Sequence, residues 1–103
     1  MVKLVALYRT PRDPAEFDRH YESVHSPLVE HYPGLRKLEL TRVSAAPLGE
    51  PKFYLMAEMY FDSREAMDAA MASPEGKAVA RDLMGFAAGF VTVFIGEVQS
   101  PRA

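Results

Sequence analysis

Apolar and polar positions follow two different periods along the chain, and together they predict four strands and two helical regions. Strand-like runs cover residues 2–8, 35–44, 53–61 and 90–98. The second run alternates in its centre, with Leu38 and Leu40 on one face. The first and last runs are almost entirely apolar, which is typical of strands that are covered on both faces.

The first helical region begins with a strong start signal. Asp13 is a good N-cap, Pro14 suits the first helical position, and Glu16 completes a capping box. One helix face is expected to be buried, at spacings of four, three and four: Phe17, Tyr21, Val24 and Leu28. Pro27 should end this helix near residue 25, because a proline ring clashes with the carbonyl four residues earlier. A short helical turn capped by Ser26 is expected to follow, up to residue 32.

The second helical region is predicted to contain two helices. Asp62 and Glu65 form a capping box before the first of them. Ser73-Pro74 should stop that helix and start the next, and Gly85 fits the C-terminus of the second. The expected apolar stripes are Ala66, Met67, Ala70 and Met71 in the first helix, and Val79, Ala80, Leu83 and Met84 in the second.

The order of elements, strand-helix-strand-strand-helix-strand, predicts an α+β fold of the ferredoxin-like βαββαβ type. Four antiparallel strands would form one sheet, with helices on one of its faces. The other face would also carry apolar side chains, and an exposed patch of that size is unusual. We therefore expect the same face of a second copy to cover it, which gives a homodimer whose two sheets close into a barrel.

Composition narrows the range of functions. The 103 residues, with 49% apolar and 25% charged positions, suit a single domain over residues 1–103, whose tail at 99–103 is expected to fray. A net charge of −2 lacks the basic excess that nucleic acids or acidic lipids attract, so neither is an expected partner. No signal peptide or membrane span is expected, which favours the cytoplasm. The chain has no cysteine, so thiol chemistry is excluded.

The three histidines do not suggest a metal site. His20 and His25 are five residues apart, which places them about 140° apart around an ideal α-helix. His31 lies beyond the expected break at Pro27. We therefore expect neither a metal ion nor another cofactor, although a haem bound through one histidine remains an open alternative.

His25 is the main candidate for chemistry. It lies at the predicted end of a helix, where the C-terminus favours the charged imidazolium while burial favours the neutral ring. Titration near neutrality would follow from that balance, and it suits a general acid or base. The alternative is a structural histidine whose ring hydrogen-bonds a carbonyl and helps to cap the helix.

Further candidates surround this histidine in the predicted fold. Glu58 lies in the middle of a strand, where a buried charge needs a partner. The alternative for it is an ion pair with a cation of the neighbouring strand: Arg36, Lys37 or Arg42. Asp82 either orients the ring of His25 or faces solvent. Tyrosines could form an aromatic pocket with polar tips, or serve as core or interface residues: Tyr8, Tyr21, Tyr54 and Tyr60.

Three segments resemble the EthD-domain family. They are Phe17-x-x-x-Tyr21-x-x-x-His25-x-Pro27-Leu28 with the following Tyr32-Pro33-Gly34-Leu35, then Ala57-Glu58-Met59-Tyr60-Phe61-Asp62-Ser63, then Ser73-Pro74-Glu75-Gly76 with Asp82 and Phe86. That family belongs to the dimeric α+β barrel superfamily, so the resemblance implies the same fold and the same dimer. Family members commonly carry Trp near Tyr21 and Tyr60, and this chain has none.

The resemblance implies a small apolar cavity in each subunit, with His25 projecting into it and Phe86 at its wall. One expected function is a cofactor-independent isomerase, lyase or oxygenase that acts on a small hydrophobic or aromatic carbonyl compound. His25 would be the acid–base group, oriented by Glu58 or Asp82. The other is a non-catalytic ligand-binding or accessory protein, as in the degradation of ethyl tert-butyl ether, from which the family takes its name. Either would need a cavity of about 300 Å³ or more.

Overall fold

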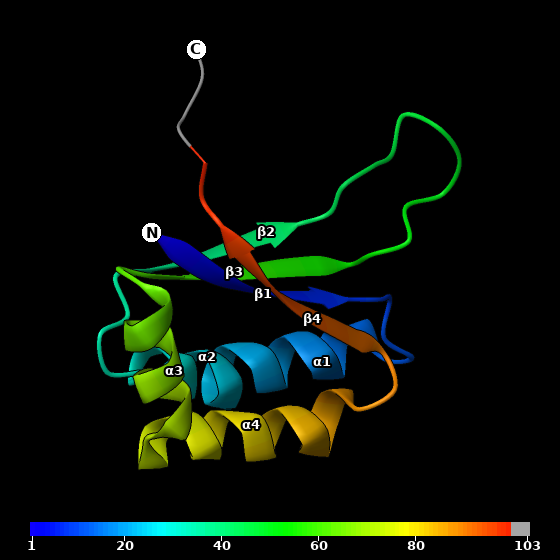
Figure 1. The fold of residues 1–103 in the computed structure, drawn as a ribbon. Coiled ribbons are helices and arrows are strands. Elements are labelled where there is room, and N and C mark those ends of the chain that lie inside the picture. The colour runs from blue at the N-terminus through cyan, green and yellow to red at the C-terminus, as the bar shows by residue number, and fades with distance from the viewer. Residues whose placement is uncertain (100–103) are drawn as a thin grey trace.

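The computed structural model describes residues 1–99 and has one four-stranded antiparallel sheet with helices on one face (Figure 1). The strands are β1 (Val2–Tyr8), β2 (Lys37–Arg42), β3 (Leu55–Phe61) and β4 (Val91–Glu97), in the order β2-β3-β1-β4. This confirms the predicted α+β class and ferredoxin-like order. Compared with the predicted ranges, β2 is two residues shorter at each end, β3 is two residues shorter at its start, and β4 is one residue shorter at each end. The expectation of a frayed tail covered residues 99–103, of which all but Gln99 lie outside the residues that the structure describes.

The helical segments are α1 (Pro14–His20), a π-helix η1 (Tyr21–His25), α2 (Ser26–Glu30), α3 (Arg64–Ala72) and α4 (Pro74–Ala87). As predicted, Asp13 caps α1, and its Oδ1 accepts a hydrogen bond from the Glu16 amide at 3.2 Å. None of the helices in residues 1–99 has the length and the apolar character needed to cross a membrane.

The predicted boundary near residue 25 is where η1 ends and α2 begins, but the predicted interruption by Pro27 was wrong, because the backbone stays helical there. The chain stays helical because η1 is a wider turn, in which the Ser26 amide donates to the Tyr21 carbonyl five residues earlier. Pro27 then falls in the first turn of α2, directly after this wider turn. Ser26 was expected to be the N-cap of this segment, but it has helical backbone angles and does not cap it.

The wider turn also changes which residues face the sheet. An extra residue in one turn advances every later inward position by one. Val24, expected to be buried, is 40% exposed, whereas His25 is only 3% exposed. The buried positions of this region are Phe17, Tyr21, His25, Val29 and Tyr32.

The start of α3 is one residue later than predicted. Its N-cap is Ser63, whose Oγ accepts a hydrogen bond from the Ala66 amide at 3.1 Å. Asp62 instead forms a bidentate ion pair with Arg36, at 2.9 and 2.7 Å. That pair ties the strand-to-helix corner to the segment that leads into β2.

The corner between α3 and α4 follows the prediction, but the end of α4 does not. Ser73 caps α4 through a 3.0 Å hydrogen bond from the Gly76 amide. The helix continues past Gly85 to Ala87, and Gly89, at φ +96°, supplies the left-handed conformation after it. Three residues of the expected apolar stripes face solvent: Met71, Ala80 and Met84.

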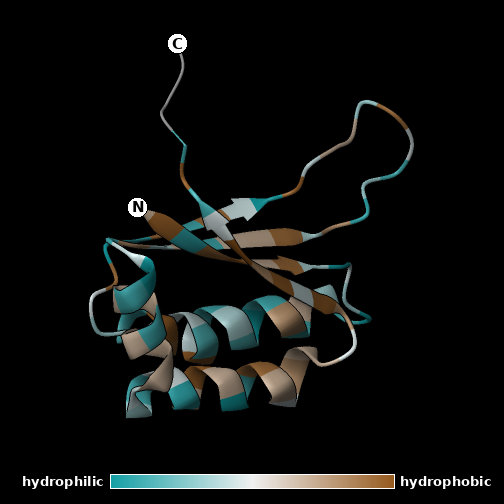
Figure 2. Ribbon diagram, in the orientation of Figure 1, coloured by the Kyte–Doolittle hydropathy of each residue, from teal (hydrophilic) through white to brown (hydrophobic). Residues whose placement is uncertain are grey.

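The core lies between the sheet and the helices, where the brown side of the helical layer faces the strands in Figure 2. Its largest fully buried side chains on this side are Tyr8, Phe61, Met67 and Val29. Burying one such side chain stabilises the fold by about 1.5–3 kcal/mol. This packing positions η1 and α4 over β1 and β3.

The other face of the sheet has no helix over it (Figure 1). The strand register places Val5 beside Phe94 and Glu58 on this open face. Phe94 is 46% exposed, and the loop between β2 and β3 rises on the same side of the sheet with Leu48 exposed in it. A single chain therefore leaves apolar surface uncovered here, as the sequence predicts.

Candidate functional site

A buried histidine on η1 is in contact with a carboxylate on α4. The π turn directs His25 inward, and α4 brings Asp82 to it, with 2.8 Å between Nδ1 and Oδ2. An ionised carboxylate can only accept hydrogen bonds, so Nδ1 carries the hydrogen and Nε2 is the basic nitrogen. The contact matches one of the two expected environments of Asp82, and among residues 1–99 the ring has this carboxylate, not a main-chain carbonyl, as its hydrogen-bond partner.

Burial controls the charge of His25. Desolvation lowers the pKa of the imidazole below its ordinary value, and the hydrogen bond that the ring donates to Asp82 offsets only part of this effect. The ring is therefore neutral at pH 7. A neutral, oriented imidazole has one nitrogen free to accept a proton.

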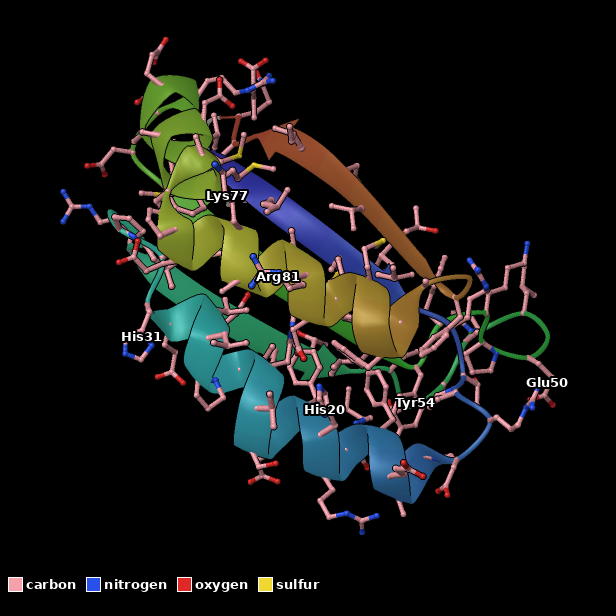
Figure 3. All side chains as sticks on the ribbon, turned by 90° about the horizontal axis from the view of Figure 1, so that it is seen from below. His20, His31, Glu50, Tyr54, Lys77 and Arg81 are labelled. Atoms are coloured by element: carbon pink, nitrogen blue, oxygen red, sulfur yellow. The ribbon has the colours of Figure 1, made fainter. Side chains whose placement is uncertain are left out.

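His20 also binds Asp82, which sequence reasoning did not anticipate. Its Nε2 lies 3.0 Å from each carboxylate oxygen. The angle of about 140° expected for His20 and His25 assumed an ideal α-helix. In a wider turn, residues five apart take the relation that residues four apart have in an α-helix, so both rings reach one carboxylate. Figure 3 shows His20 between the first helical region and α4.

Aromatic rings surround the buried imidazole. Tyr21 and Phe86 lie against His25, with ring centroids 5.2 and 4.8 Å away. Tyr8 meets Tyr21 edge-on at 5.5 Å. Burial raises the pKa of Tyr8, and raises that of Tyr21 to about 12, so both hydroxyls keep their protons.

A cavity of about 40 Å³ adjoins His25; we call it the inner cavity. Its lining is Leu4, Ala6, Tyr8, Tyr21, His25, Val29, Tyr32, Met59, Val79, Leu83 and Val93. Val93 is 45% exposed, so the cavity approaches the surface between α4 and β4. The expected volume of about 300 Å³ or more is not found here, because aromatic side chains fill most of the space. Tyr32 also lines this cavity, although the sequence analysis did not identify it as a candidate site residue.

A larger hollow lies on the other side of Tyr21, between the first helical region and β2. This outer cleft has a volume of about 290 Å³ and is lined by Asp18, Tyr21, Glu22, Ser26, Leu40, Arg42 and Leu55. At its rim Asp18 accepts a 2.9 Å hydrogen bond from Tyr54 and pairs with Arg42 at 3.2 Å. Tyr54 therefore belongs to this rim and does not reach His25.

Two further candidates lie on the open face of the sheet, away from the imidazole. Glu58 forms an ion pair with Lys3 at 2.6 Å and raises the pKa of that lysine. The partner comes from β1, not from the cations around β2 that were expected. The Tyr60 ring lies between the ammonium groups of Lys3 and Lys37, at 5.5 and 5.3 Å. Because alternate strand residues face opposite sides, Glu58 is not placed to orient His25.

The structure thus brings together five of the candidate residues, namely Tyr8, Tyr21, His25, Asp82 and Phe86. It leaves Tyr54, Glu58 and Tyr60 elsewhere. In residues 1–99, no three His, Asp or Glu side chains are grouped so that they could hold a metal ion.

The buried neutral imidazole should make stability depend on pH. In the unfolded chain His25 takes up a proton at about pH 6.5, whereas the folded protein resists that proton. Its contribution to stability is therefore complete above pH 6.5 and is lost as the pH falls toward the lowered pKa of the folded state. Urea unfolding at pH 7.5 and pH 5 should show a smaller decrease for His25→Gln than for the wild type. Equal decreases would mean that another group controls the pH dependence.

Comparison with known proteins gives a consistent family match. The EthD domain matches residues 9–89. An uncharacterized 11.0 kDa protein of Rhodococcus erythropolis, encoded between thcB and thcC, is 35% identical over 100 residues, or 97% of each chain. A crystal structure of an EthD family protein from Bacillus halodurans C-125 is 49% identical, with a TM-score of 0.93 over 96% of this chain and 99% of that one.

More distant structures share the fold alone. SnoaB from Streptomyces nogalater, a cofactor-independent oxygenase, is 17% identical with a TM-score of 0.69, over 97% of this chain and 94% of its own. A dimeric ferredoxin-like protein of unknown function from Thermobifida fusca is 14% identical with a TM-score of 0.68, over 94% and 90%.

Proposed function

Because this chain belongs to the EthD family and buries a histidine–aspartate pair beside an aromatic cavity, we propose that it catalyses proton transfer on a small hydrophobic carbonyl compound. His25 would be the acid–base residue, and Asp82 would orient it. The observation that carries this proposal is the 2.8 Å contact between the two side chains, with the imidazole almost fully buried. Buried pairs of this kind fix one tautomer and stabilise the cation that forms when the ring accepts a proton.

The chemistry needs no electron acceptor. Nε2 of His25 takes the proton from the carbon next to a carbonyl, and the electron pair of the broken C–H bond moves onto the carbonyl oxygen. The imidazolium that results is paired with Asp82. Return of the proton to the same carbon exchanges it, and return to another carbon of a conjugated compound gives an isomer.

The Tyr21 hydroxyl is the donor best suited to the enolate oxygen. It is protonated at neutral pH, and its ring lies beside His25, with the ring centroids 5.2 Å apart. Tyr21 also lines both the inner cavity and the outer cleft. A shift of this one ring would join the two hollows and give a carbonyl compound the room that the inner cavity lacks.

A second candidate function is non-catalytic binding of a small ligand, as an accessory protein in a degradation pathway such as that of ethyl tert-butyl ether. The observation that favours it is the outer cleft of about 290 Å³, which has room for a small ligand and whose lining does not include His25. Such a protein would bind a ligand without exchanging its protons.

The uncovered sheet face supports a homodimer as part of the proposal. Leu7 of β1 and Phe94 of β4 lie on this face and are partly exposed in the single chain, so a second copy would remove them from water. The description of the T. fusca protein as dimeric agrees with this arrangement.

Exchange of α-protons tests the proposed catalysis. Acetophenone and an unsaturated γ-lactone in D₂O serve as probes, and the loss of their α-proton signals is followed by ¹H NMR. We expect exchange above the buffer rate with the wild type and a 10²- to 10⁴-fold slower enzymatic rate with His25→Gln.

The matched control is His31→Gln, since His31 is exposed and its Nδ1 contacts the nearby Pro27 carbonyl at 2.7 Å. This variant should exchange at the wild-type rate. Chemical-shift changes in the protein without probe exchange would favour the accessory function. Equal exchange by wild type and folded His25→Gln would remove His25 from the reaction.

A further inference from the structure

The Asp82 carboxylate has two imidazole partners, and the proposed function uses only one of them. His25 binds Oδ2 at 2.8 Å, while His20 Nε2 lies 3.0 Å from both oxygens. The His25 side chain is 3% exposed, that of Asp82 18%, and that of His20 33%. The three groups therefore run from the core to the surface.

We propose that His20 is a positioning residue for His25. It anchors the carboxylate of Asp82 through both oxygens, and its own charge determines how strongly Asp82 supports a proton on His25. The catalytic effect of His20 rests on the proposed function. The sharing of the Asp82 carboxylate does not, because it can be tested in the ligand-free protein.

The anchoring follows from the hydrogen-bond geometry. Two oxygens 3.0 Å from one nitrogen fix the plane of the carboxylate, which is otherwise free to rotate on the surface of α4. Phe86 packs against both imidazoles, with ring centroids 4.7 and 4.8 Å away. This apolar ring closes one side of the cluster, so that Asp82 is the polar connection between the two histidines.

His20 is the most exposed member of the cluster. It lines a surface groove of about 360 Å³, together with Pro11, Arg12, Asp13, Glu16, Phe17, Gly85, Phe86 and Phe90. A proton from solvent therefore reaches His20 before His25. Once charged, His20 binds the carboxylate more strongly and repels a second positive charge on His25. The Coulomb effect of His20 lowers the pKa of His25, in agreement with this.

Other titratable groups around the cluster are few. His25 is faced by Asp82 from α4, by Tyr8 from β1 and by Tyr21 and Tyr32 from its own helical region. His20 is faced by Asp82 and shares its groove with Arg12, Asp13 and Glu16. The tyrosines that burial affects keep their protons at neutral pH. The hydrogen-bonded cluster therefore consists of Asp82 and the two imidazoles.

Ring-nitrogen NMR of the ligand-free protein tests the inference. The ¹⁵N shifts of His25 report its tautomer and its titration from pH 5 to 8. In His20→Gln, the side-chain amide can still donate to Asp82 but cannot become charged. We expect this variant to keep hydrogen on Nδ1 of His25 and to raise the titration midpoint by roughly half a unit to one unit. His31→Gln is the control and should shift nothing.

His20→Phe removes the donor as well as the charge. We expect a mixture of His25 tautomers in this variant, and proton exchange on the acetophenone probe at least several-fold slower than with His20→Gln. An unchanged His25 titration in His20→Gln would overturn the inference, and this outcome can be read even if His20→Phe does not fold. Absence of probe exchange in the wild type would contradict the proposed function while leaving the titration test intact.

Discussion

Replacing Gly76 by alanine should destabilise the protein by more than about 3 kcal/mol, which is a large fraction of the roughly 5–15 kcal/mol that stabilises a typical domain. Gly76 lies in the first turn of α4, where the chain folds back on α3. A Cβ added there would meet the Ala70 carbonyl oxygen, and would lie 2.7 Å from the carbonyl oxygen of Met71 and 2.8 Å from its carbon. All three are backbone atoms of α3, so no side chain can move aside. A displaced α4 would also carry Asp82 away from His25.

Gly85→Ala is the matched control for this change. It adds the same methyl group to the same helix at a position with no atom within 4 Å of the new Cβ. Alanine is the better helix former, so we expect equal or greater stability, by up to about 1 kcal/mol. Thermal and urea unfolding of both variants will show the contrast. Similar stability of the two variants would mean that α3 and α4 do not approach as closely as described.

Phe94→Asp should convert the proposed homodimer into a monomer. Phe94 is 46% exposed in the single chain and is paired in register with Val5 on the open face. A carboxylate buried there without a partner costs about 3–5 kcal/mol, which corresponds to a loss of more than 100-fold in dimer affinity. Analytical ultracentrifugation at 10 µM should give twice the 11.5 kDa chain mass for the wild type and the chain mass for the variant.

Met84→Asp tests whether the open face is the interface. Met84 is also an exposed apolar residue, at 57%, but it lies on α4, which covers the opposite face of the sheet. We expect this variant to stay dimeric. Dissociation by Met84→Asp alone would place the interface on the helical side, and a wild-type monomer would contradict the dimer altogether.

Local features of the sequence predicted the fold class. Strand patterns, the Asp13 and Ser73 caps and the order of elements depend on near neighbours along the chain, and each is found in the structure. The predicted start of α3 was one residue early because Asp62 and Ser63 are both good caps. The tertiary ion pair of Asp62 with Arg36 leaves Ser63 to cap the helix.

The candidate site could be predicted only in part. His25, Asp82, Tyr8, Tyr21 and Phe86 were found from residue type, burial pattern and family resemblance. Glu58 was a candidate because a carboxylate in an apolar strand needs a partner, and it has one in Lys3. Successive side chains of a strand alternate between the two faces of a sheet, but this alternation does not tell which face the helices cover. Only the assembled sheet therefore shows that Glu58 and His25 lie on opposite sides.

By itself, the sequence determined the βαββαβ order, the helix caps and a histidine in the first helical region. The tertiary structure alone decided that His25, not Val24, is buried, that His20 shares Asp82 with it, and that aromatic rings leave about 40 Å³ beside the imidazole. The physical reason is the single π turn before Pro27. Its extra residue changes every later inward-facing position of the first helical region. His20 and His25 contact Asp82 across 62 and 57 positions of the sequence, and a local pattern cannot predict such contacts.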